Sequence, residues 1–195
     1  MDGAMSAGRF DAVARYTRTA VVLHWLIALM IIVNTALGLS FSRVPDAMVR
    51  PFIDMHKSLG ITVMVLAFAR LAWRATHRPP PLPAGYARWE HATAHVAHWA
   101  LYGLIFALPI SGWLHDSAWG LASTHPIYLF GLIPWPRIWF VMGPESPAQD
   151  QLHSALAVVH NWFGFALDAL LALHVLGALK HQFIDRHPEF RRMAP

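Results

Sequence analysis

Apolar residues are concentrated in four stretches, and charged, proline-rich or turn-forming segments separate them. The stretches run over residues 20–39, 52–73, 94–113 and 156–179. A helix of about 20 residues crosses the roughly 30 Å hydrocarbon core of a bilayer. The pattern therefore predicts four transmembrane helices, which form one membrane domain over residues 1–195.

Composition narrows the class of protein to which this pattern belongs. Hydrophobic residues make up 56% of the chain and charged residues only 13%, and the mean hydropathy is +0.39. Soluble domains carry about 25% charged residues. We therefore predict an all-α integral membrane protein that folds as a four-helix bundle. Asn34, Asp168 and several histidines interrupt the apolar stretches, which favours a bundle that holds a cofactor or another polar group in its core.

Basic residues are distributed unevenly over the segments that flank the four stretches. One side of the predicted membrane receives Arg9, Arg15, Arg18, Arg70, Arg74, Arg78, Arg88, Lys180, Arg186, Arg191 and Arg192. The other side receives Arg43, Arg50, Lys57 and Arg137. Positive residues favour the cytoplasmic side, so both termini are predicted to be cytoplasmic. The charges form no compact basic face, which excludes nucleic acid as a partner.

Four histidines in the apolar stretches indicate the chemistry. His160 and His174 lie fourteen residues apart, which separates them by about 21 Å along one helix and returns them to within about 40° of the same face. His24 lies at the membrane depth of His174, and His56 lies at the depth of His160. Membrane depth therefore predicts two ligand pairs, His24 with His174 on the cytoplasmic side and His56 with His160 on the periplasmic side.

Such pairs are suited to two bis-histidine haems, stacked in the bundle core. The chain has no cysteine, which excludes a covalent Cys-x-x-Cys-His attachment and a cysteine-ligated cluster. Any haem is therefore non-covalent and of the b type. Asp168 is rotated by about 80° from His160, so we expect it off the haem face, with a partner that the sequence does not identify.

The chain resembles the bacterial cytochrome b561 family of four-helix di-haem membrane proteins. The resemblance lies in LHWLIALMIIVNTALGL, HKSLGITVMVLAFARLAWR, HVAHWALYGLIFALPISGW and LHVLGALKHQFIDR, which together cover most of the apolar sequence. The haem ligands that it implies correspond to His24, His56, His160 and His174. It also implies an electron carrier of the bacterial inner membrane that is linked to the quinone pool. Some close members are superoxide oxidases that pass the electron to ubiquinone.

Other residues near these levels are candidates for secondary roles. Arg70 lies fourteen residues after His56, and His95 and His98 share a face at the start of the third span. All three are candidate contacts to a haem propionate or to quinone. Lys57 is a candidate for attracting superoxide to the periplasmic side, although a snorkelling interfacial lysine is the simpler explanation.

Two alternatives to a superoxide:ubiquinone oxidoreductase stay open at this point. The chain could be an electron-carrier subunit that serves a partner dehydrogenase, with the long segment from His115 to Gln151 as the interface or as a substrate entrance. A histidine-lined metal or proton transporter is less favoured, because Asp168 is the only carboxylate deep in a span. The sequence leaves the oligomeric state open.

Overall fold

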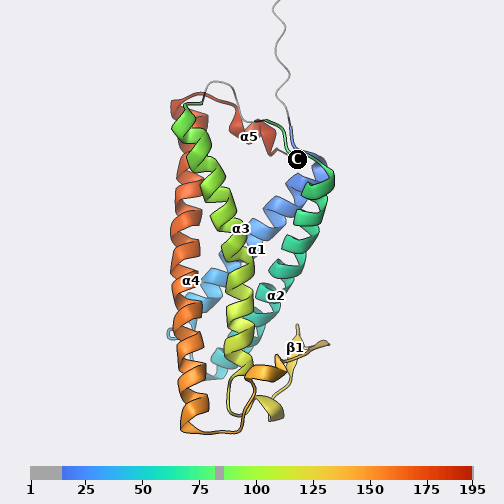
Figure 1. Ribbon diagram of the computed structural model, residues 1–195, viewed down its shortest axis with the longest axis vertical. Helices are drawn as coiled ribbons and strands as arrows, with labels where there is room; N and C mark the ends of the chain where they lie inside the picture. Colours follow the sequence, from blue (N-terminus) through green and yellow to red (C-terminus); the bar gives the residue numbers. More distant parts are fainter. Residues whose placement is uncertain (1–14, 82–85, 195) are drawn as a thin grey trace, which may run out of the picture.

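The fold is an up-and-down bundle of four long helices, seen in a computed structural model that describes residues 15–81 and 86–194 (Figure 1). The helices are α1 (Arg18–Ser40), α2 (Asp46–Thr76), α3 (Arg88–Ser117) and α4 (Pro147–Leu179). A π-helical turn η3 (Lys180–Ile184) and the short α5 (Glu189–Arg192) follow α4. Helices adjacent in sequence pack together, and the most extensive contacts join α1 to α2 and α3 to α4. The all-α fold class is confirmed.

All four helices are long and apolar enough to cross a membrane. Each helix contains one of the predicted stretches and begins before it. The difference is largest for α4, which begins at Pro147, whereas the predicted stretch begins at residue 156. Hydropathy marks the part of a helix that suits lipid, whereas capping decides where the helix begins. Ser146 accepts a hydrogen bond from the Gln149 N–H at 3.3 Å, and Pro147 occupies the first helical turn.

The packed centre of the bundle is small. Ile27 and Ile31 of α1, Val63 of α2 and Leu167 of α4 form its buried cluster. Large apolar side chains such as Val96 and Trp99 of α3 are exposed on the outside instead, as expected where lipid surrounds a bundle.

The segment between α3 and α4 is ordered, although the sequence predicted only a long loop. It contains η1 (Ala122–Thr124), the antiparallel strands β1 (Ile127–Leu129) and β2 (Ile133–Trp135), and η2 (Trp139–Val141). The turn of the hairpin places Phe130 and Gly131 at positive φ, 53° and 72°, as tight hairpin turns require. The strands are only three residues long, so no alternating pattern was long enough to predict them.

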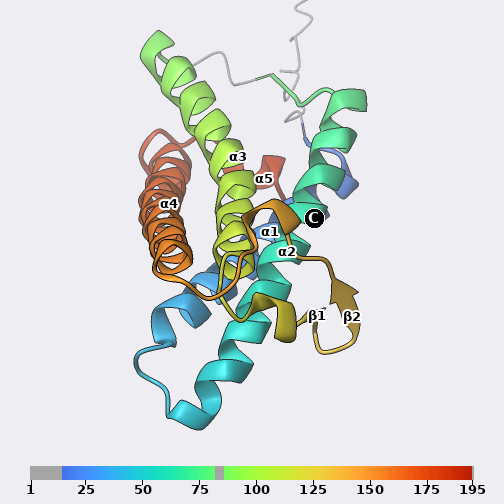
Figure 2. The same cartoon turned by 60° about the horizontal axis from the view of Figure 1, so that its bottom comes forward.

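Buried polar side chains fasten this segment to the helices. The Ser58 hydroxyl of α2 accepts a hydrogen bond from the Phe130 N–H at 2.8 Å, and the Ser117 hydroxyl of α3 accepts one from Ile138 at 3.0 Å. The Gln149 amide of α4 donates to the carbonyls of two further residues of the segment, Ala118 and Val141. We call this end of the bundle the hairpin end (Figure 2).

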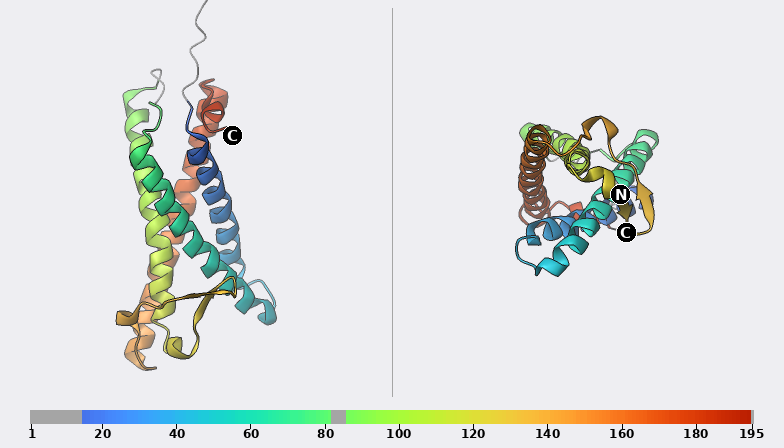
Figure 3. Two further views of the ribbon diagram at one scale, coloured as in Figure 1. Left: turned by 90° about the vertical axis from the view of Figure 1, so that its right-hand side faces the viewer. Right: turned by 90° about the horizontal axis from the view of Figure 1, so that it is seen from below.

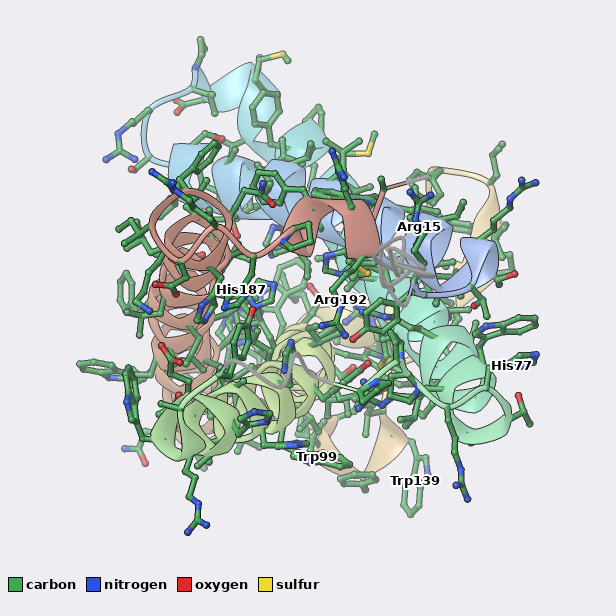
Figure 4. The ribbon with its side chains drawn as sticks, turned by 90° about the horizontal axis from the view of Figure 1, so that it is seen from above. Arg15, His77, Trp99, Trp139, His187 and Arg192 are labelled. Carbon is green, nitrogen blue, oxygen red and sulfur yellow. The ribbon has the colours of Figure 1, made fainter. Side chains whose placement is uncertain are left out.

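The opposite end carries α5 and is called the α5 end. Arg192 is buried there, and its Nη2 donates to the backbone carbonyls of Pro80 and Pro81 at 3.3 and 2.7 Å. The Trp25 indole of α1 donates to the Met193 carbonyl at 2.8 Å. Viewed from this end, Arg192 lies over the middle of the bundle (Figure 4). The C-terminal segment therefore ties α1 to the connection between α2 and α3.

Candidate functional site

Two histidine pairs face one another inside the bundle, at two different levels. At the hairpin end, the ring centroids of His56 and His160 are 6.1 Å apart. Toward the α5 end, those of His24 and His174 are 6.3 Å apart. Each pair joins α4 to another helix, α2 in the first case and α1 in the second. The structure thus brings together the same partners that membrane depth selected.

The ring separations fit a metal ion held between the two rings of a pair. A histidine nitrogen binds such an ion at about 2 Å, and the ring centre lies about 1 Å behind that nitrogen. Two axial imidazoles on one iron therefore have ring centres about 6 Å apart. Both pairs agree with this value, so the residues present are suited to bis-histidine haem.

Hydrogen bonds select the tautomers of the hairpin-end pair. His56 Nδ1 lies 3.0 Å from the Asn34 carbonyl oxygen, and His160 Nδ1 lies 3.1 Å from that of Leu108 and 3.1 Å from the Ser111 hydroxyl. A carbonyl oxygen only accepts, so Nδ1 carries the proton in each ring. The Nε2 lone pair is then free to ligate iron, which is the usual arrangement of metal-binding histidines.

Two glycines leave room for the same rings. A Cβ atom at Gly112 of α3 would lie 2.9 Å from Cε1 of His160, and one at Gly38 of α1 would lie 3.2 Å from Cε1 of His56. The first distance is shorter than real Cβ contacts, so Gly112 is required for this position of His160. Sequence reasoning did not single out Gly112. The adjacent small residues Ser111 and Gly112 in a bulky apolar stretch were the available signal.

A cavity of about 580 Å³ opens beside the hairpin-end pair, between the helices. Its lining includes His56, His160 and Asp168. Asp168 thus lies in the wall of this cavity, and the expectation that it lies off the haem face stays a prediction. Thr35 of α1 is the partner that the sequence did not identify, and its hydroxyl donates to Asp168 Oδ1 at 3.3 Å.

Charged residues gather at the rim of this cavity. Lys57 of α2 forms an ion pair with Asp116 of α3, and Asp116 also accepts from Arg137 Nη1 at 2.9 Å. The side chains of Lys57 and Asp116 are only 19% and 15% exposed. Lys57 thus lines the cavity, as a paired cation rather than a free surface lysine.

His115 and His153 are joined at the same rim, although they are 38 positions apart in the sequence. Their rings stack with centroids 4.0 Å apart. Each Nδ1 donates to the backbone carbonyl of the other residue, at 3.1 and 2.9 Å. No local pattern predicted this pair, because it depends on how α3 packs against α4.

Polar residues also surround the pair toward the α5 end. The His98 ring lies 5.5 Å from that of His174, and Arg70 is close enough to interact electrostatically with both His24 and His174. The Arg70 guanidinium also lies over the Tyr102 ring, 5.8 Å from its centroid. His95 is exposed one turn before His98. In the part of the chain that the structure describes, it makes no ring contact with His24 or His174.

An ionic cluster joins α3 to η3 at the α5 end. Lys180 Nζ donates to Glu90 Oε1 at 2.8 Å and to Asp185 Oδ2 at 2.7 Å. His181 Nδ1 lies 2.7 Å from the same Asp185 oxygen. The Lys180 ammonium, helped by His181, lowers the pKa of Asp185 below its usual value.

The fold and the two histidine pairs define a class of protein: a four-helix membrane protein that binds haem b and transfers electrons. Comparison with known protein families gives the same class, because the family model for prokaryotic cytochrome b561 matches residues 15–195. The chain belongs to the prokaryotic cytochrome b561 family, whose members are haem b electron-transfer proteins and include oxidoreductases.

Three relatives match nearly the whole chain. Cytochrome b561 homolog 2 of Escherichia coli (strain K12) is 35% identical over 182 residues, which is 92% of this chain and 90% of the relative. Probable superoxide oxidase CybB of Yersinia pestis is 26% identical over 186 residues, which is 93% of this chain and 96% of the relative. Cytochrome b561 homolog 1 of Escherichia coli (strain K12) is 23% identical over 183 residues, which is 93% of this chain and 97% of the relative.

Proposed function

We propose that this chain is a di-haem electron carrier linked to the quinone pool, with superoxide as electron donor and ubiquinone as acceptor. One haem b would bind between His56 and His160, and the other between His24 and His174. The observation that carries the proposal is that two histidine pairs at different levels of the bundle have nearly the same distance between ring centroids, 6.1 and 6.3 Å. When bound, the haems would supply the one-electron oxidation and reduction that side chains of these types do not perform.

We also propose that the protein lies in the bacterial inner membrane with its α5 end in the cytoplasm. The basic residues support this orientation, because most of those in the described part of the chain lie at or near the α5 end. They are Arg15, Arg18, Arg70, Arg74, Arg78, Arg88, Lys180, Arg186, Arg191 and Arg192. The hairpin end then faces the periplasm.

Charge at the hairpin end favours an anionic donor. Lys57 and Arg137 carry two positive charges, and Asp116 between them carries one negative charge, so the cluster has a net charge of +1. Positive potential beside a cavity of low polarity attracts small anions such as superoxide. Asp116 holds both cations at the rim. The relative named as a probable superoxide oxidase supports the same donor.

Residues toward the α5 end are suited to binding an acidic group or a quinone. The Arg70 guanidinium would pair with a carboxylate such as a haem propionate. His98 lies against His174 and offers a hydrogen bond to either partner. His95 would contribute only to a ligand that extends one turn further along α3.

Rapid mixing of the oxidised protein with superoxide tests this function. The Soret and α bands report the oxidation state, and dithionite defines full reduction. We expect fast reduction by superoxide that added ubiquinone reverses. Full reduction by dithionite without a response to superoxide would overturn superoxide as the donor. Absence of haem bands would overturn the whole proposal.

The Lys57→Glu variant sharpens this test. It replaces a cation of the rim by an anion, so reduction by superoxide should slow at low ionic strength and recover toward the unmodified rate as salt is added. Arg43→Glu is the matched control, because it makes the same change of charge at an exposed site of the same end that does not line the cavity. Equal rates for both variants would contradict a role for Lys57.

A further inference from the structure

The tip of the hairpin has an unusual composition for a segment outside the bundle. Residues 127–135 read Ile-Tyr-Leu-Phe-Gly-Leu-Ile-Pro-Trp and carry no charge. Four of these side chains are exposed: Tyr128 by 47%, Phe130 by 46%, Leu132 by 81% and Ile133 by 58%. We call these four residues the apolar tip. Clustered exposed apolar side chains usually mark a surface that something apolar covers.

The hairpin projects sideways, beyond α2, and does not close over the end of the bundle (Figure 2; Figure 3). Its depth along α2 is set by the hydrogen bond from the Phe130 N–H to Ser58, whose side chain is fully buried. Ser58 lies six residues inside the span predicted to begin at residue 52, which is about 9 Å along the helix. The apolar tip therefore lies beside the first turns of the membrane-crossing part of α2, near its outer boundary.

Charge along α2 changes at the same place. Asp46, Arg50, Asp54 and Lys57 occupy the turns before Ser58, and no charged residue occurs in residues 58–69. The outer face of α2 beyond this point carries exposed apolar side chains. The attachment point of the hairpin thus coincides with the boundary between a charged and an apolar part of the helix.

We propose that the apolar tip is embedded in the lipid bilayer, at the boundary between headgroups and acyl chains. Lipid is the occupant that these observations favour, because the tip continues the lipid-facing surface of α2 and carries no charge for a polar partner to recognise. Aromatic and aliphatic residues are the usual anchors at this depth. Trp139, which is 80% exposed, points outward from the bundle as a second aromatic anchor (Figure 4).

The backbone of the hairpin is compatible with this depth. A free strand edge in the hydrocarbon core would leave peptide groups unsatisfied, whereas headgroups and water satisfy them at the boundary. Pro134 lies in β2 opposite Tyr128 and has no N–H to satisfy. An anchored tip would hold the segment between α3 and α4 at a constant depth. It would keep the ion pair of Lys57 and Asp116 at the membrane surface.

The cysteine-free chain allows a direct test of the proposal. Leu132→Cys introduces a single cysteine, which can carry a nitroxide spin label in the haem-loaded protein reconstituted into phospholipid vesicles. Power-saturation EPR then compares collisions with oxygen, which partitions into lipid, and with a water-soluble nickel chelate. We expect oxygen to relax the label several-fold more effectively than the chelate does. Gln151→Cys, at an exposed polar position early in α4, should show the reverse preference.

Two outcomes would overturn the proposal. A label at residue 132 that the nickel chelate relaxes as strongly as it does at residue 151 would place the tip in water. A label shielded from both reagents would place the tip against protein, such as a second copy of this chain. Ile133→Cys repeats the measurement one residue further along, in case the change at Leu132 disturbs the turn.

Discussion

The two histidine pairs have almost the same ring separation, yet their surroundings differ. At the hairpin end, His56 and His160 are each oriented by a backbone carbonyl of a neighbouring helix. Toward the α5 end, neither His24 nor His174 makes a ring hydrogen bond in the described part of the chain. The second pair is surrounded by other side chains instead, among them His98 and Trp25.

This difference shows that equal spacing in a sequence does not imply equal construction. Backbone carbonyls do not change with a side-chain substitution, so the hairpin-end imidazoles keep one tautomer and one orientation as long as the helices stay in register. The pair toward the α5 end depends on flanking side chains. We therefore expect substitutions to separate the two levels.

Loss of a proposed ligand should have the largest effect. In His160→Ala, the hairpin-end haem loses one of its two axial imidazoles, so we expect the haem content to fall by about half. The pair of His24 and His174 lies in a different layer and should keep most of its haem. A pyridine haemochrome assay gives the ratio of haem to protein, and low-temperature EPR shows which low-spin signal disappears.

His153→Ala is the matched control for this substitution. It removes a histidine two turns earlier on the same helix, one that stacks on His115 and does not face His56. This variant should keep both haems. Unchanged haem content in His160→Ala would refute the assignment of that ligand, and complete loss would show that the two levels are not independent.

A smaller effect is expected from Gly112→Ala. The added Cβ would lie 2.9 Å from Cε1 of His160, so the ring or helix α3 must move. We expect partial loss of the hairpin-end haem and a changed midpoint potential for the remainder, with the other haem unchanged. Spectroelectrochemical titration of the two components measures both effects.

Gly103→Ala on the same helix controls for the change in helix propensity. A Cβ at Gly103 has no neighbour within 4 Å, and this glycine is exposed. Its haem content and potentials should equal those of the unmodified protein. If the two glycine variants behaved alike, the close approach of Gly112 to His160 would be irrelevant to haem binding.

The sequence was sufficient to predict the features of this molecule that depend on hydrophobic periodicity and on membrane depth. Length and hydropathy located the four helices, and the spacing between His160 and His174 indicated two levels in one bundle. Helix α4 begins before its predicted span because capping by Ser146 adds polar turns that hydropathy does not count. The hydrogen bond between Thr35 and Asp168 was missed because it depends on how α1 packs against α4.

The same reasoning explains why the segment between α3 and α4 could not be predicted. Its strands are three residues long, and it is held in place by Ser58, Ser117 and Gln149, which belong to three different helices. Each of these residues looks like an ordinary polar residue in its own helix. Only the packed bundle brings them to one surface.

The smallest effect concerns stability at the α5 end. Hydrogen bonding to Lys180 lowers the pKa of Asp185, so the charged carboxylate stabilises the folded state. For an acid with a lowered pKa, this contribution is complete above the pKa of the unfolded chain and disappears as the pH falls through the folded value. Asp185→Asn should therefore lower Tm by no more than a few degrees at neutral pH. The difference should begin to shrink as the pH falls below about 4, the usual pKa of an aspartate in an unfolded chain, and vanish only below the lowered pKa of the folded state.

Thermal unfolding followed through the Soret band at several pH values measures this difference. Asp54→Asn is the comparison at the hairpin end, where it removes an exposed ion pair with Arg50 within one helix. Such pairs contribute little, so its Tm should stay close to that of the unmodified protein at every pH. Asp185 differs because Lys180 also binds Glu90, so the same ammonium joins α3 to η3. A pH-independent loss of Tm in Asp185→Asn would mean that the side chain acts through packing rather than through its charge.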